Sequence, residues 1–133
     1  MKHRMLPLLL MTMSSLLACE APVTPAVSIT APAEGATLKS NEVVQFIFDV
    51  DDFELDPAAV GESPEAGHGH IHIFLDDLTQ PIQTTPASAI DIDLSSLVLT
   101  PGFHVFRAAL FNNDHTPIEE AISDSVEVNI EAP

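Results

Sequence analysis

The chain has 133 residues, 20 of them acidic against four lysines and arginines, and its formal net charge at pH 7 is −16. The strongly negative electrostatic field of such a chain repels nucleic acid and anionic lipid headgroups, and it concentrates cations near the surface. We therefore exclude nucleic acid as a partner and expect one domain, because about a hundred residues after a leader are too few for two.

The first segment has the features of an export signal. Residues 2–4 (Lys-His-Arg) are basic, and residues 5–17 form an apolar run too short to span a bilayer. The sequence Leu-Leu-Ala-Cys ending at Cys19 resembles a bacterial lipobox, which implies that residues 1–18 are a signal peptide and that Cys19 is lipidated. Glu20 follows the cysteine, where an aspartate would imply retention at the inner membrane. We expect an outer-membrane lipoprotein of the bacterial cell envelope; the alternative is an uncleaved N-terminal anchor.

Removal of residues 1–18 changes the composition of the chain. All four methionines leave, as do two of the four basic residues, whereas no acidic residue is lost, so the formal charge becomes −18. Lipidation uses the single cysteine, and stability must then come from an apolar core rather than from a disulfide. Residues 19–26, with Pro22 and Pro25, are expected to form a short stiff tether.

Residues 27–131 predict an all-β domain. Short apolar stretches alternate with turn signals, and no helical period is sustained. The expected strands cover residues 27–30, 43–50, 70–76, 90–94, 103–111 and 125–130. Six or seven short strands in this length are typical of an immunoglobulin-like antiparallel β-sandwich.

The segment 101–106 (Pro-Gly-Phe-His-Val-Phe) resembles the start of the F strand of that fold. His104 and Phe106 then point inward, and Arg107 lies on the other face. The resemblance makes residues 43–50 strand B, 70–76 strand C and 125–130 strand G, with C and F as antiparallel neighbours.

A group of histidines lies at the predicted start of strand C. His68, His70 and His72 alternate with other residues, and side chains two apart on a strand share a face about 6.5 to 7 Å from each other. Ile71 and Ile73 take the opposite face, which leaves the histidine face free of the core. A strand-borne His-x-His with a further histidine is a common way to build a three-histidine metal site.

The topology predicts where the further ligand lies. Strand C begins at the end of the sandwich where strand F finishes, so the loop 112–117 should lie beside His68 and His70. His115 is the expected partner, with Asp114 as a ligand or as an acceptor that orients an imidazole. His104 lies at the opposite end, and we interpret it as structural, hydrogen-bonded near Asp76 or Asp77. The competing interpretation of the whole group is a solvated or internally hydrogen-bonded histidine patch.

Acidic residues form a second candidate cluster before these histidines. They could collect calcium but lack the glycine and terminal glutamate of an EF-hand loop, so a solvated loop is the preferred interpretation. The residues are Asp49, Asp51, Asp52, Glu54 and Asp56.

Motifs in this chain resemble a group of small exported bacterial immunoglobulin-like domains of unknown function. The resemblance rests on Gly-His-x-His ending in Leu-Asp, which is residues 67–76 here, and on Asn-Asp-His-x-Pro, residues 113–117. Ile71 stands where that group often has another histidine. The resemblance implies the fold but supplies no activity.

Three functions remain open from the sequence. The leading hypothesis is a lipid-anchored protein that binds a divalent metal for capture, buffering or handover, and not an enzyme, because no nucleophile or general base accompanies the histidines. Imidazole and carboxylate ligands without methionine or thiol suit Cu(II) or Zn(II). The alternatives are an adhesion or assembly module that recognises another envelope protein, and a metalloenzyme with an open histidine site.

Overall fold

A computed structural model describes residues 20–77 and 79–133, so the predicted signal peptide and Cys19 lie outside the described residues. The described chain is almost entirely β, with a single 3-10 turn, η1 (Leu94–Ser96). No helix in the described residues is long and apolar enough to cross a membrane.

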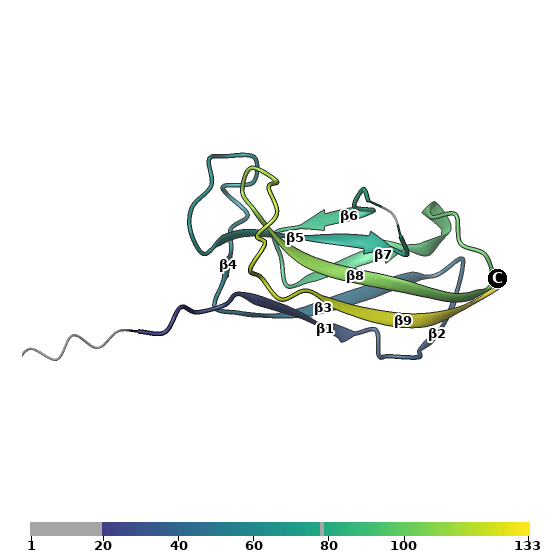
Figure 1. The fold of residues 1–133 in the computed structure, drawn as a ribbon. Coiled ribbons are helices and arrows are strands. Elements are labelled where there is room, and N and C mark those ends of the chain that lie inside the picture. Colours follow the sequence, from purple (N-terminus) through teal and green to yellow (C-terminus); the bar gives the residue numbers. More distant parts are fainter. Residues whose placement is uncertain (1–19, 78) are drawn as a thin grey trace, which may run out of the picture.

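Two sheets face each other across the core (Figure 1). The smaller sheet has the order β1-β3-β7, formed by β1 (Ala26–Ala31), β3 (Val43–Asp51) and β7 (Ala89–Asp93). The larger sheet has the order β2-β9-β8-β5-β4. β6 also pairs with β5, at residues 71–73, whereas β4 pairs with residues 68–69. Its members are β2 (Thr37–Lys39), β4 (Glu54–Leu55), β5 (His68–Leu75), β6 (Gln83–Thr85), β8 (Gly102–Asn112) and β9 (Asp124–Glu131).

The predicted fold class and all six predicted strands are confirmed. Strands B, C, F and G of the prediction are β3, β5, β8 and β9, and β5 and β8 are antiparallel neighbours as expected. The prediction missed β2, β4 and β6, which have only two or three residues and therefore show no alternation of their own.

Alternation along the long strands places the core between the sheets. In β3 every second residue from Val44 to Phe48 is buried, and the ring of Phe46 lies 5.0 Å from that of Phe106 in β8. Ile71 and Ile73 of β5 are fully buried in the same cluster. Burial of each such side chain stabilises the fold by about 1.5 to 3 kcal/mol, so the core fixes the register of β5 against β8.

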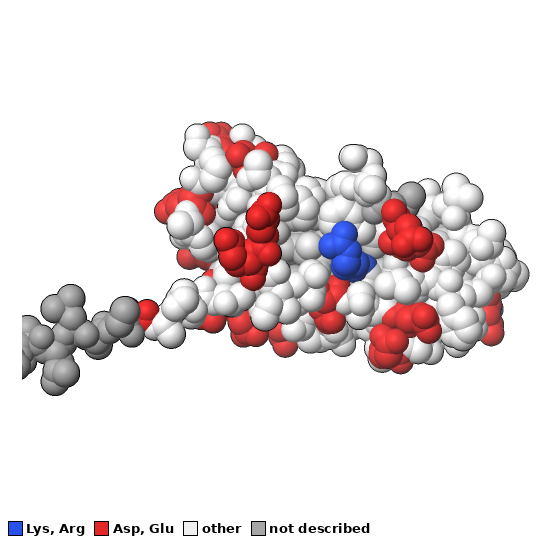
Figure 2. Space-filling model, in the orientation of Figure 1, with Lys and Arg blue, Asp and Glu red and all other residues white. Residues whose placement is uncertain are grey.

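Two long connections meet at one end of the sandwich (Figure 1). The loop between β3 and β5 reaches the loop after β8, where the Gly61 amide donates a 2.7 Å hydrogen bond to the Asn113 carbonyl. On the face shown in Figure 2, acidic side chains gather on several loops and strands, whereas basic side chains occupy one small area.

Candidate metal centre

Strand β5 places two histidines on the outer face of the larger sheet. Since Ile71 and Ile73 point into the core, His70 and His72 point away from it. Both histidines are nevertheless buried, at 0% and 5% exposure. The prediction of a histidine face opposite the apolar face is therefore confirmed, but that face is covered rather than open.

A compact turn after β8 brings the third histidine over β5. The His115 amide donates to the Asn112 carbonyl at 2.9 Å, and the Asn112 amide donates to the Thr116 carbonyl, also at 2.9 Å. Asp114 Oδ1 accepts from the amide and the hydroxyl of Thr116. His115 has a φ of 65°, a left-handed conformation that histidine adopts more readily than most residues.

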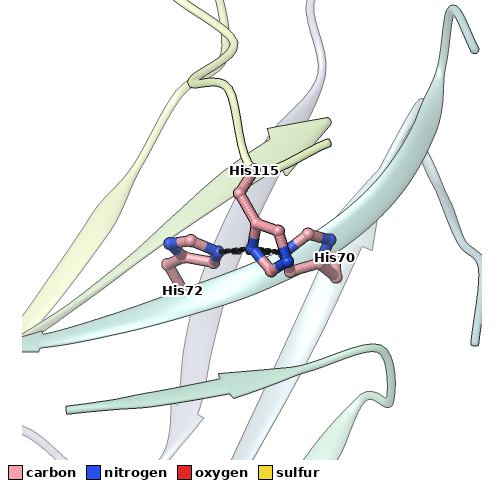
Figure 3. A group of neighbouring side chains, drawn as sticks. All are labelled: His70, His72 and His115. Atoms are coloured by element: carbon pink, nitrogen blue, oxygen red, sulfur yellow. Dashed lines mark hydrogen bonds between the residues drawn. The ribbon is translucent and has the colours of Figure 1, made fainter. Parts of the chain in front are cut away.

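Three ring nitrogens converge on one point in this arrangement (Figure 3). His70 Nε2 lies 2.9 Å from His72 Nε2 and 3.0 Å from His115 Nδ1, and the third separation, from His72 Nε2 to His115 Nδ1, is 3.1 Å. The structure thus brings together three of the five residues predicted as metal ligands, which are His70, His72 and His115.

Hydrogen bonding among these rings cannot satisfy all three contacts. Each nitrogen either carries a proton and donates, or presents a lone pair and accepts. With three nitrogens and two roles, at least two must share a role, so one contact at about 3 Å pairs two donors or two lone pairs. A cation at the centre removes this conflict, because it accepts all three lone pairs at once.

The spacing also fits the dimensions of a metal site. Nitrogens about 3.0 Å apart, each about 2.05 Å from one ion, subtend an angle of about 94° at that ion. This is a cap of three ligands on one side of the ion, which leaves coordination positions open on the other. The arrangement can hold a divalent ion and present it to a further ligand.

The pKa values favour the neutral rings that coordination requires. Burial lowers the pKa of His72 to about 4, and the rings of His70 and His115 add to the effect. Burial lowers the pKa of His70 as well, with His115 contributing. Protons therefore compete for these two nitrogens at a lower pH than for an ordinary histidine, whose pKa is 6.5.

Aromatic packing holds the rings in place. Phe111 of β8 stacks on His72 with centroids 3.8 Å apart and planes 9° from parallel, and His70 meets His115 edge to face at 4.5 Å. His70 Nδ1 is buried without a hydrogen-bond partner among the described residues, so no hydrogen bond at that atom orients the ring. No role was predicted for Phe111, although it lies four residues after Arg107 on the same strand and therefore shares its outer face.

The structure does not bring His68 or Asp114 to the three nitrogens. His68 lies in a separate group with Asp56 and Glu65, where its nitrogens are 3.8 to 4.0 Å from carboxylate oxygens. Asp114 instead stabilises the turn after β8. The hydrogen bonds that Thr116 donates to its carboxylate lower the pKa of that carboxyl.

His104 lies away from the cluster and has the environment that the sequence predicted. Its Nδ1 lies 2.8 Å from Asp76 Oδ2, and its Nε2 lies 2.8 Å from the Thr100 carbonyl oxygen. Burial works to lower the pKa of His104, but these two hydrogen bonds outweigh it and raise the pKa above 6.5. The contact ties β8 to the turn after β5.

Comparison with known proteins identifies the fold. No protein-family model matches the chain, and no curated protein matches its sequence. The chain is similar in structure to the fibronectin(III)-like modules of Clostridium thermocellum CbhA, with a TM-score of 0.52 and 13% identity over 80% of this chain and 96% of that one. The fold is a fibronectin(III)-like sandwich. A second similar structure is the endo-beta-1,4-mannanase from Thermotoga petrophila, with a TM-score of 0.51, 15% identity, and coverage of 86% of this chain and 21% of that one.

A cavity of about 400 Å³ opens beside the histidines on the outer face of the fibronectin(III)-like sandwich. His72 and His115 line it, together with Phe74 and Phe111 from the same face. Residues between β5 and β6, among them Pro81, also line the cavity, as does Thr84 of β6. This cavity could not be predicted from the sequence, because these loop residues have no repeating pattern.

Proposed function

We propose that this domain binds one divalent transition-metal ion, Cu(II) or Zn(II), through His70, His72 and His115. The observation that carries the proposal is the convergence of three imidazole nitrogens, two from buried rings and one from the exposed His115, that cannot all be hydrogen-bonded to one another. Such a site in a lipid-anchored envelope protein suits capture, buffering or handover of the ion.

The choice of ions follows from the donor atoms. Imidazole nitrogens suit Zn(II) and Cu(II), whereas Ca²⁺ and Mg²⁺ prefer oxygen ligands. The part of the chain after Cys19 contains no methionine or cysteine, so it lacks the soft sulfur ligands that Cu(I) prefers. Lipidation at Cys19 and location at the outer membrane are part of the proposal and rest on the lipobox resemblance alone.

Metal binding by the soluble domain tests the proposal. Residues 20–133, prepared without a histidine tag, are titrated with Zn(II) and Cu(II) by calorimetry, and bound metal is quantified after dialysis. Alanine at position 70, 72 or 115 should weaken affinity at least about tenfold, equivalent to roughly 1.4 kcal/mol.

Two histidines outside the cluster provide matched controls for that titration. His104→Ala and His68→Ala each remove one imidazole but leave the three converging nitrogens in place. Both should therefore retain the affinity of the wild type. Equal affinity in all five variants would contradict the proposed site and favour diffuse binding to the acidic surface, which falls as salt is added.

The second candidate function is an adhesion or assembly module. The observation that favours it is the likeness to fibronectin(III)-like modules, which concerns the fold alone. A domain that takes up no metal but is retained by envelope proteins of its own cell would support this alternative.

A further inference from the structure

We propose that the metal site also takes a small organic carboxylate, whose oxygen completes the coordination of the ion and whose apolar body occupies the adjoining cavity. This inference rests on the proposed metal site and adds the class of its second ligand. It starts from the position of the cavity, which touches two of the three metal-binding rings, those of His72 and His115.

The proposal places the free coordination positions of the ion on the side of the cavity. His70 is completely buried, whereas His72 and His115 are the members of the cluster that line the cavity. An ion capped on one side by three nitrogens has its free positions on the other side. A ligand that approaches through the cavity therefore reaches the ion without displacing a histidine.

The charges around the cavity favour an anion. The chain has 20 acidic residues, yet none of the eight described residues that line the cavity is acidic. The guanidinium carbon of Arg107 lies 4.3 Å from the centre of the Phe74 ring, which forms part of the cavity wall. Arg107 and the bound ion thus provide positive charge next to a cavity whose described lining carries no carboxylate.

The walls favour an apolar body on that anion. Phe74 and Phe111, with ring centroids 6.1 Å apart, contribute two aromatic rings to the lining, and Pro81 adds a further apolar side chain. Thr84 and Gln80 contribute neutral polar groups, which can contact a ligand without repelling a carboxylate. A volume of about 400 Å³ is in the range of small-molecule sites.

Benzoate is a suitable probe, because it combines one carboxylate with a flat apolar ring. The soluble domain is first loaded with Zn(II), its metal content is measured, and benzoate binding is followed by calorimetry. Loaded protein should bind benzoate at least about tenfold more tightly than metal-free protein. By linkage, benzoate should raise the affinity for Zn(II) by the same factor.

Two analogues separate the contributions of the ion and of the cavity. Acetate keeps the carboxylate and loses the ring, whereas benzamide keeps the ring and loses the charge. Both should bind loaded protein at least about tenfold more weakly than benzoate. If acetate binds as tightly as benzoate, the cavity takes no part and the inference is wrong.

Paired substitutions test the location. Thr84→Trp fills the cavity from an exposed position and should weaken benzoate binding, whereas Gln83→Trp, at the neighbouring exposed position outside the lining, should not. Arg107→Gln should weaken it a few-fold, and Lys39→Gln should leave it unchanged. Each variant is compared only after its metal content has been measured.

The outcomes distinguish this inference from the proposed function. If the domain takes up neither Zn(II) nor Cu(II) in the first titration, the proposed function and this inference are both overturned. Normal Zn(II) binding with equal benzoate affinity in loaded and metal-free protein overturns the second ligand alone. Equal benzoate affinity in Thr84→Trp and Gln83→Trp also overturns it, and the proposed metal site then stands.

Discussion

Replacing His72 by phenylalanine should weaken metal binding and raise the free energy of unfolding of the metal-free protein in mild acid. The substitution keeps an aromatic ring against Phe111, on which His72 stacks at 3.8 Å. It removes one of the three converging nitrogens, so that the remaining two can form a single hydrogen bond with one donor and one acceptor. It also removes a buried group that becomes charged when the protein unfolds in mild acid.

The size of the effect follows from the pKa of His72. That pKa is about 4 in the folded chain, against 6.5 for an ordinary histidine. Because the folded pKa is lowered, the unfolded state binds more protons between these values, and the free energy of unfolding falls as pH falls from about 6.5 toward 4. Linkage gives a loss of about 2 kcal/mol at pH 5, which solvent at the cavity side reduces to about 1 to 2 kcal/mol.

Bound Zn(II) should reverse the order of stability between the wild type and His72→Phe. Zn(II) at a hundred times its dissociation constant adds about 2.7 kcal/mol to the wild type at pH 7, and it adds at most about 1.4 kcal/mol to a variant whose affinity is at least about tenfold weaker. Metal-free His72→Phe should therefore be more stable than metal-free wild type at pH 5. With Zn(II) at pH 7, the wild type should be the more stable protein.

Urea unfolding followed by far-ultraviolet circular dichroism measures both differences, because the chain has no tryptophan or tyrosine for fluorescence. His68→Phe is the matched control, since it changes a histidine of the same strand that lies outside the cluster and should keep the stabilisation by Zn(II). Parallel curves of unfolding free energy against pH for wild type and His72→Phe would refute the reasoning, as would equal stabilisation of both by Zn(II).

Four further outcomes are expected. Ile73→Ala should lower the free energy of unfolding by about 2 to 5 kcal/mol, more than alanine at any of the three metal-binding histidines does without metal, and urea titration checks this. His104→Ala should lower the free energy of unfolding by about 1 to 2 kcal/mol at pH 6 and by less at pH 9. The pKa of His104 is raised in the folded protein, so its stabilisation is present below about pH 6.5 and is lost as pH rises through the folded pKa. Urea unfolding at the two pH values measures the difference. Gly69→Ala should weaken both stability and Zn(II) affinity, since the new Cβ would collide with the Phe111 carbonyl oxygen and separate β5 from β8; calorimetry compares it with wild type. Cys19→Ser should abolish lipidation and release the protein from the membrane fraction, and mass spectrometry of the processed N-terminus would detect any lipid that persists.

The sequence predicted those parts of the site that follow from strand periodicity and chain direction. The two-residue alternation around Ile71 and Ile73 placed His70 and His72 on one face. The antiparallel order of β5 and β8 placed the loop with His115 at the start of β5, where the register pairs His70 with Phe111. Both arguments need only local geometry and the fold class.

The rest of the site depends on tertiary packing that no local pattern encodes. The burial of the histidine face comes from Phe111 and the turn before Thr116, which cover it together. His68 lies two residues before His70 and on the same face of β5. The rise of the strand separates it from the cluster, and its partners are Asp56 and Glu65. Periodicity gives the face on which a side chain lies, and the contacts across that face decide its partners.

The contrast between the surface and the site explains how an acidic domain could select a transition metal. Carboxylates on the surface attract every cation, including Ca²⁺ and Mg²⁺, and give little discrimination among them. The cluster at His70, His72 and His115 contains no carboxylate ligand, and burial lowers the pKa of His70 and His72, which favours their neutral rings. Hard cations gain little from imidazole nitrogen, whereas Zn(II) and Cu(II) bind it well. Selectivity in the proposed site would thus come from excluding the acidic residues that dominate the rest of the chain, while those residues raise the local concentration of the ion to be captured.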